Sequence, residues 1–178
     1  MTNDSDTRSE RRDELRDRLE ITEMAQRCAL LADYGPADEW AGLFTENGSW
    51  NMPDSHIRAH GRAELKNLAR VFLDMAPGLH RVQSNLVITL NGDTATGWCE
   101  MNEFLNTPSG PLATIQGRFR DEYKRTGERW LIASRTFVPA DGGTQGLREG
   151  PAAPVFRPLL TRLTELFEDK KGPNREHL

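Results

Sequence analysis

The hydrophobic period of the chain changes near residue 80, and this change limits the folds that the sequence can adopt. Before it, apolar residues recur every three or four positions, as they do on the buried stripe of a helix. After it, apolar and polar residues alternate, which is typical of strands with one buried face. The predicted helices are residues 9–32, 39–44 and 61–75. The predicted strands are a short one at residues 49–52 and four successive ones at residues 81–90, 94–105, 112–124 and 129–138.

The connections between the four successive strands are short and rich in Gly, Asn and Pro, which favours an antiparallel meander. Helices followed by a meander predict an α+β fold with the helices packed on one face of a curved sheet. We expect one domain at residues 9–138, since 178 residues leave little room for a second. Residues 1–8 are expected to be disordered. Residues 139–178 are expected to form a Gly- and Pro-rich arm followed by an amphipathic helix at residues 158–170.

The charge balance argues against several function classes. Lys and Arg number 23 and Asp and Glu number 27, which gives a net charge of −4. No net positive field is present to release phosphate counterions, so neither a nucleic acid nor a membrane surface is expected as a partner. The chain contains no apolar run of about 18 residues, and its first residues lack the apolar stretch of a secretory signal. We therefore expect a cytoplasmic protein in which Cys28 and Cys99 are reduced, buried thiols.

The motifs predict neither a cofactor nor a metal. The sequence contains no glycine-rich phosphate loop and no dinucleotide fingerprint. His56 and His60 have the spacing of metal ligands on a helix, but their segment lacks a helical pattern and no third ligand stands at a fixed spacing. We expect both histidines to lie in a polar surface loop.

Several short motifs follow one another in a specific order. They are Leu31-Ala32-Asp33, residues 38–50 with their DEWAGLF start, Gly61-Arg62-Ala63-Glu64-Leu65, Asn85-Leu86-Val87-Ile88, residues 117–123 and residues 130–135. With this order and spacing, the chain resembles the SnoaL-like branch of the nuclear transport factor 2-like superfamily over about residues 14–138. Relatives in this superfamily include scytalone dehydratase, ketosteroid isomerase and polyketide cyclases.

The resemblance implies a cone-shaped α+β barrel. A strongly curved antiparallel sheet would wrap around the N-terminal helices and open at one end to an apolar pocket. The superfamily also contains non-enzymes, such as the small subunit of ring-hydroxylating dioxygenases. The fold therefore does not decide the function, and the residues of the pocket must.

The resemblance also implies a catalytic pair. Dehydratase-like relatives use an aspartate at the end of the first helix, here Asp33, together with a histidine on the first meander strand, here His80. Such a histidine can take a proton from carbon, and the carboxylate fixes its tautomer. In the relatives the histidine stands four residues before the asparagine, whereas His80 precedes Asn85 by five. Either a β-bulge near residues 83–84 aims His80 into the cone, or Arg81 points there instead.

Further side chains are candidates for substrate binding, and each has a plainer interpretation as core or surface. They are Tyr34, Trp50, Arg81, Asn85, Trp98, Glu100, Asn102, Phe119 and Arg135. The aromatic residues fit an apolar pocket but also an ordinary core. Arg135 stands where the dehydrochlorinase relative holds the departing anion. Trp98, Glu100 and Asn102 share one strand face, which suits either a polar-tipped pocket or a wet subunit interface.

The sequence therefore predicts a cofactor-free lyase or isomerase, with dehydration as the leading reaction. The Asp33–His80 pair would abstract a proton from a small, mostly apolar cyclic substrate. A polyketide- or steroid-type cyclase or isomerase with the same pocket is one alternative, and a non-catalytic ligand-binding or assembly subunit is the other. A homo-oligomer is expected, because the convex sheet face and the apolar stripe of the C-terminal helix would leave interaction surfaces.

Overall fold

The computed structural model describes residues 4–140 and 143–168. Its helices are α1 (Asp4–Tyr34), α2 (Ala37–Gly42), α3 (Gly61–Met75), α4 (Gln145–Glu149) and α5 (Ala153–Phe167), with a 3₁₀ turn, η1 (Pro53–Ser55). Its strands are β1 (Phe44–Met52), β2 (Ile57–His60), β3 (Leu79–Asn91), β4 (Thr94–Thr107), β5 (Gly110–Thr126) and β6 (Arg129–Pro139). Within the described ranges, no helix is both long and apolar enough to cross a membrane.

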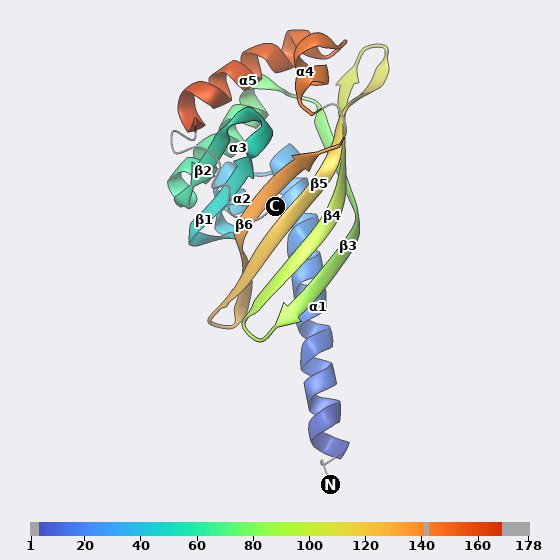
Figure 1. Ribbon diagram of the computed structural model, residues 1–178, viewed down its shortest axis with the longest axis vertical. Helices are drawn as coiled ribbons and strands as arrows, with labels where there is room; N and C mark the ends of the chain where they lie inside the picture. The colour runs from blue at the N-terminus through green and yellow to red at the C-terminus, as the bar shows by residue number, and fades with distance from the viewer. Residues whose placement is uncertain (1–3, 141–142, 169–178) are drawn as a thin grey trace.

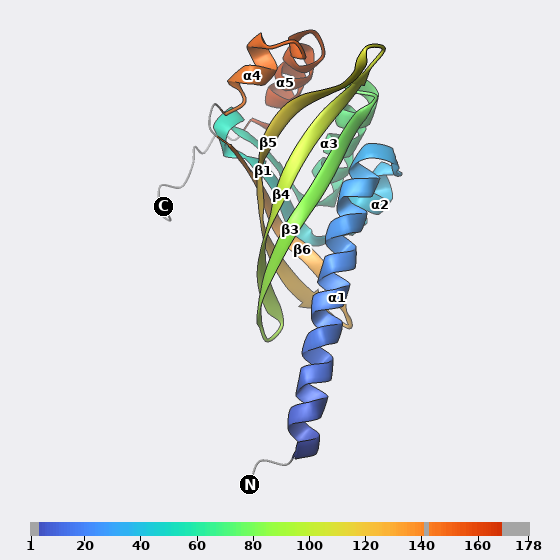
Figure 2. The same ribbon diagram turned by 90° about the vertical axis from the view of Figure 1, so that its right-hand side faces the viewer.

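The strands form one curved sheet in the order β2-β1-β6-β5-β4-β3. Neighbouring strands are antiparallel except β1 and β6, which run parallel. Figures 1 and 2 show α1, α2 and α3 on one face of the sheet, with α5 across one end of it. The predicted α+β fold, a strongly curved sheet around N-terminal helices, is confirmed. The sheet stays open between β2 and β3, so the barrel is incomplete.

Segments with a strong hydrophobic period have the predicted structure. Helix α3 spans the predicted residues and buries Leu65, Leu68 and Ala69. The meander strands are slightly longer than expected, because their ends continue to pair close to the turns, as Thr107 does with Gly110. The hydrophobic period predicts these elements correctly, because each of them buries one whole face.

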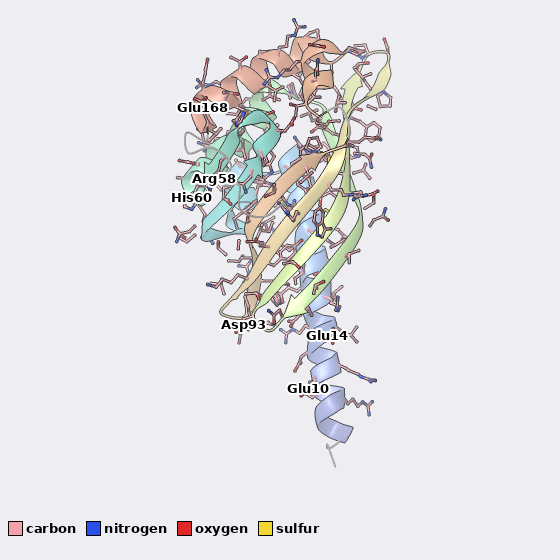
Figure 3. The ribbon with its side chains drawn as sticks, viewed as in Figure 1. Glu10, Glu14, Arg58, His60, Asp93 and Glu168 are labelled. Carbon is pink, nitrogen blue, oxygen red and sulfur yellow. The ribbon has the colours of Figure 1, made fainter. Side chains whose placement is uncertain are left out.

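Residues 54–61, expected to be a polar loop, instead contain η1 and β2. Strand β2 pairs antiparallel with β1 and forms one edge of the sheet. Ile57 and Ala59 are buried, whereas Arg58 and His60 are exposed (Figure 3). This alternation covers only four residues, which is too short to separate a strand from a loop in a sequence.

The N-terminal boundary of the fold also differs from the prediction. Helix α1 begins at Asp4, so residues 4–8 are helical rather than disordered, while residues 1–3 lie outside the described residues. Extending an existing helix by a few residues is easy compared with nucleating a new one, which explains the earlier start. Residues 8–16 are exposed, and Figure 3 shows Glu10 and Glu14 on a part of α1 that projects beyond the sheet.

The C-terminal segment folds back over the end of the cone. Helix α5 begins at Ala153, five residues before the predicted start, with Pro154 in its first turn, where a missing N–H is tolerated. Apart from Leu166, which is 36% exposed, the residues of its apolar stripe are buried within the same chain: Phe156, Leu159, Leu160, Leu163 and Phe167. The expectation that the α5 stripe forms an intermolecular surface is therefore wrong.

Two contacts fasten this segment to the body. Near α4, the Asp54 carboxylate accepts hydrogen bonds from the backbone N–H and the hydroxyl of Thr144, both at 3.0 Å. Beyond α5, Glu168 forms an isolated antiparallel bridge with Ile57 on β2. Helix α5 is thus held at both ends, and its buried side chains become part of the wall of the cone.

Candidate active site

A mostly apolar cavity lies inside the cone, where α1, α3, the concave sheet face and α5 meet. The space open to the centre of a water molecule is about 70 Å³, against the ~10–15 Å³ that a single water needs by this measure. Its apolar lining includes Trp40, Trp50, Phe72, Met101, Phe119, Phe137, Phe156, Leu159 and Leu163. The cavity can therefore hold several waters, and its mostly apolar and aromatic lining is typical of sites that bind small molecules.

Polar side chains also reach this apolar wall, namely Arg81, Gln83, Glu103 and Arg135. The two guanidinium groups lie over aromatic rings of the wall, 4.9 Å from the centre of the Phe72 ring for Arg81 and 4.5 Å from that of Phe119 for Arg135. Each guanidinium group forms buried ion pairs: Arg81 with Asp33 and Glu103, and Arg135 with Asp121. The cavity is therefore bounded by two buried ionic groups in an otherwise apolar wall.

The first cluster joins Asp33, Arg81 and Glu103. The Asp33 carboxylate accepts hydrogen bonds from the backbone N–H of Arg81 at 2.7 Å and from its Nη1 at 2.6 Å. Nε of Arg81 forms an ion pair with Oε2 of Glu103 at 3.0 Å. The side chains of Asp33 and Glu103 are 2% and 6% exposed, so the interaction takes place away from water. Asp33 thus holds Arg81 against the carboxyl group of Glu103.

Glu103 has the environment of a proton-transfer group. Burial raises its pKa above the ordinary value of 4.5, although the Arg81 charge and a hydrogen bond from Thr114 oppose this shift. The Thr114 hydroxyl lies 3.0 Å from Oε1 of Glu103. Among the described residues, Glu103 is the one carboxylic acid that lines the cavity. A carboxyl group with a raised pKa exchanges protons more readily near neutral pH.

The second cluster is built on adjacent positions of β5 and β6. Arg135 pairs across the strands with Asp121 and donates Nε and Nη2 to its two carboxylate oxygens at 2.8 and 2.7 Å. The Tyr123 hydroxyl donates to the same carboxylate at 2.8 Å, and Nη1 of Arg135 donates to the Cys28 sulfur at 3.0 Å. Burial raises the pKa of the Cys28 thiol, so Cys28 is a neutral acceptor here. Arg135 and Asp121 are 2% and 0% exposed and neutralise each other.

The structure does not bring His80 into the cavity. Strand β3 has a bulge, but the register shift falls between Ser84 and Val87, with Asn85 in the left-handed region at φ 54°. The residues before the bulge keep their alternation, so Arg81 points inward and His80 outward. Nδ1 of His80 lies 3.8 Å from Asp33 and 2.9 Å from the Tyr34 hydroxyl, on the surface. Of the two placements left open by the sequence, the one with Arg81 in the cone is the one observed.

The other predicted substrate-binding residues divide into two groups. Trp50, Arg81, Phe119 and Arg135 line the cavity. The remainder lie outside it: Tyr34 and Asn85 are exposed, and Trp98, Glu100 and Asn102 are on the outer face of β4. On the surface, Glu100 accepts a hydrogen bond from Asn85 and pairs with Arg118.

Sequence reasoning missed Glu103 and Trp40 as cavity residues. Glu103 shares its strand face with Cys99 and Met101, so the alternation of β4 contained a signal, namely a charged residue within an apolar series. Trp40 had no comparable signal, because an aromatic residue in a short amphipathic helix is typical of a core.

Sequence and structure comparisons place the chain in a known family. A family model described as the SnoaL-like domain matches residues 13–136. The chain belongs to this SnoaL-like family. The predicted membership of the nuclear transport factor 2-like superfamily is confirmed. Among curated proteins, no sequence matches the chain significantly.

Solved structures share the SnoaL-like fold with this chain. A singly substituted form of Rv3472, a protein of unknown function from Mycobacterium tuberculosis, is similar with a TM-score of 0.79 and 22% identity over 87% of this chain and 93% of its own. A nuclear transport factor 2-like protein with a cystatin-like fold from Novosphingobium aromaticivorans has a TM-score of 0.72 and 25% identity, over 90% and 99%. A protein from the same organism, provisionally assigned as a scytalone dehydratase, has a TM-score of 0.63 and 17% identity, over 71% and 86%.

The Asp121–Arg135 pair makes a direct stability prediction. Asp121→Asn leaves the buried Arg135 guanidinium without a counter-charge, so we expect the free energy of unfolding to fall by about 3–5 kcal/mol. Asp93→Asn is the matched control, because Asp93 is 82% exposed and pairs with Arg125 at the surface. Its expected cost is about 0–1 kcal/mol. Urea unfolding followed by circular dichroism measures both, and equal costs for the two variants would contradict the pairing.

Proposed function

We propose that the protein is a cofactor-free proton-transfer enzyme of isomerase, cyclase or dehydratase type, acting on a small, mostly apolar cyclic substrate in the cavity. The observation that carries the proposal is the carboxyl group of Glu103, buried in the cavity wall with a raised pKa. Membership of the SnoaL-like family supports chemistry of this type without a cofactor.

Glu103 can serve as base and acid in one reaction. As a carboxylate it removes a proton from a carbon of the substrate and becomes a neutral acid. It then returns the proton to a second carbon, which completes an isomerisation, or to a departing hydroxyl group, which leaves as water. The ion pair with Arg81 stabilises the carboxylate form of Glu103, whereas burial stabilises the neutral acid. Because the two effects oppose each other, Glu103 can both accept and donate a proton.

In this proposal Asp33 is a positioning residue rather than half of an Asp–His pair. Both of its oxygens are engaged by Arg81, which places the guanidinium beside Glu103. His80 takes no part in the chemistry, because its ring lies outside the cavity wall. Trp50, Phe119 and the two cavity arginines would contact the substrate.

We further propose that the protein is a homo-oligomer associating through the outer face of β3 and β4. This face exposes Val82, Val87 and Trp98, with 41–65% of each residue accessible, and Val87 pairs with Trp98 across the two strands. Apolar residues gathered on one face of a sheet favour association. The cytoplasmic location expected from the sequence stays a prediction.

Light scattering tests the proposed oligomer. We expect a mass of at least twice the 20.1 kDa of one chain, and a shift toward that single-chain mass for Trp98→Glu. Leu15→Glu is the control, because Leu15 is 67% exposed on the projecting part of α1 and lies away from this face. A single-chain mass for the unmodified protein at every concentration would contradict the proposal.

Proton exchange with a small ketone tests the enzymatic function. In D₂O, the wild-type protein is expected to catalyse exchange of the α-protons of cyclohexanone, followed by ¹H NMR. Glu103→Gln should lower the rate by about 10²–10⁴-fold, the usual contribution of a general acid–base group. Glu100→Gln is the matched control on the outer face of the same strand and should leave the rate unchanged, as should His80→Gln.

Two outcomes would contradict this assignment. Loss of exchange in His80→Gln but not in Glu103→Gln would restore the Asp33–His80 pair. Binding of the ketone without exchange above the buffer rate would favour the non-catalytic alternative, a ligand-binding protein.

A further inference from the structure

Trp40 lines the cavity and carries a hydrogen-bond donor that has no partner. The residue lies on α2, lines the cavity and is 4% exposed. Among buried side-chain nitrogen and oxygen atoms in the described part of the chain, Nε1 of Trp40 is the one without a hydrogen-bond partner. An unpaired buried donor is destabilising, so an acceptor inside the cavity, either water or an oxygen atom of a ligand, would stabilise the indole N–H.

The surroundings of Trp40 hold the ring in place without satisfying its N–H. The indole packs against Phe44 with ring centres 4.8 Å apart. Its N–H lies near the Cys28 sulfur and favours the thiolate form there, yet it makes no hydrogen bond of acceptable geometry. That sulfur already accepts from Arg135 and is a weak acceptor. The indole N–H therefore remains available to a stronger acceptor, such as an oxygen.

The charges around the cavity indicate which kind of oxygen fits. Arg135 is neutralised by Asp121, and Arg81 is shared between Asp33 and Glu103. Neither guanidinium offers an uncompensated positive charge to an anionic ligand. A carboxylate or phosphate would thus be buried without a counter-charge, whereas a neutral carbonyl oxygen needs only a donor.

We propose that the Trp40 indole N–H donates a hydrogen bond to a neutral oxygen acceptor on the ligand, and that Trp40 thereby determines specificity for oxygen-bearing rings over hydrocarbons. The inference rests on the proposed function in placing the ligand in this cavity, but not on the role of Glu103. During proton abstraction, the same donor would stabilise negative charge developing on the oxygen of an enolate.

A matched pair of ligands isolates this hydrogen bond. Cyclohexanone and methylenecyclohexane have the same ring and differ in carrying =O or =CH₂. In ¹⁵N-labelled wild-type protein, the Trp40 indole proton, assigned by its absence in Trp40→Phe, should move downfield with the ketone and not with the alkene. Trp50 also lines the cavity, so its indole resonance reports binding of either ring.

The affinities of the two rings provide the second measurement. In Trp40→Phe, the ratio of the ketone Kd to the alkene Kd should rise roughly fivefold or more over wild type, the factor expected for one lost hydrogen bond. A change in cavity size affects both rings and cancels in the ratio. Because the wild-type indole shift needs no variant, the proposal stays testable if Trp40→Phe fails to fold.

The outcomes separate this proposal from the proposed function. If the Trp50 resonance moves with the ketone while the Trp40 proton does not, the Trp40 proposal is overturned and the cavity stands. If neither ring perturbs either tryptophan, both the Trp40 proposal and the proposed function fail. If the Trp40 shift is present in wild type and in Glu103→Gln while proton exchange is absent from both, the Trp40 proposal stands and the enzymatic function fails.

Discussion

Burying two guanidinium groups beside one cavity is the constraint on which the rest of this structure depends. An arginine can leave water only if a carboxylate accompanies it and its N–H groups find acceptors. Asp121, on the strand next to Arg135, meets this need within the sheet. Asp33, at the end of α1, meets it for Arg81 and thereby ties the first helix to β3. The ionic groups of the wall thus connect the elements that form the cone, and they place the Glu103 carboxyl group at the cavity.

The same arrangement explains what the sequence predicted and what it could not. The 3.6 and 2 periods of long segments identified α3 and the four meander strands, since each buries a full face. The position of Asp33 at the helix end was predicted from the resemblance, but its partner was not. That partner depends on where the bulge in β3 falls, and the bulge follows both His80 and Arg81. The Asp121–Arg135 pair depends on the register between β5 and β6, which a single sequence does not specify.

The C-terminal helix α5 forms part of the apolar wall of the cavity. Helix α5 supplies Phe156, Leu159 and Leu163 to the wall, fastened by the Asp54–Thr144 contact at one end and the Ile57–Glu168 bridge at the other. Burial in this wall raises the pKa of Glu103 by desolvation, which disfavours its charged form. Family membership, the apolar cavity and the buried acid are the three observations that support the proposed proton-transfer function.

The most direct test of this account is a titration of the Glu103 carboxyl group, followed by ¹³C NMR of the labelled side chain and assigned by its absence in Glu103→Gln. The account predicts an inflection above the ordinary pKa of 4.5, because desolvation outweighs the Arg81 charge. Glu100, on the outer face of the same strand, provides a comparison in the same sample. An inflection for Glu103 at or below 4.5 would show that Arg81 holds it as a permanent carboxylate, and would contradict its role as a proton-transfer group.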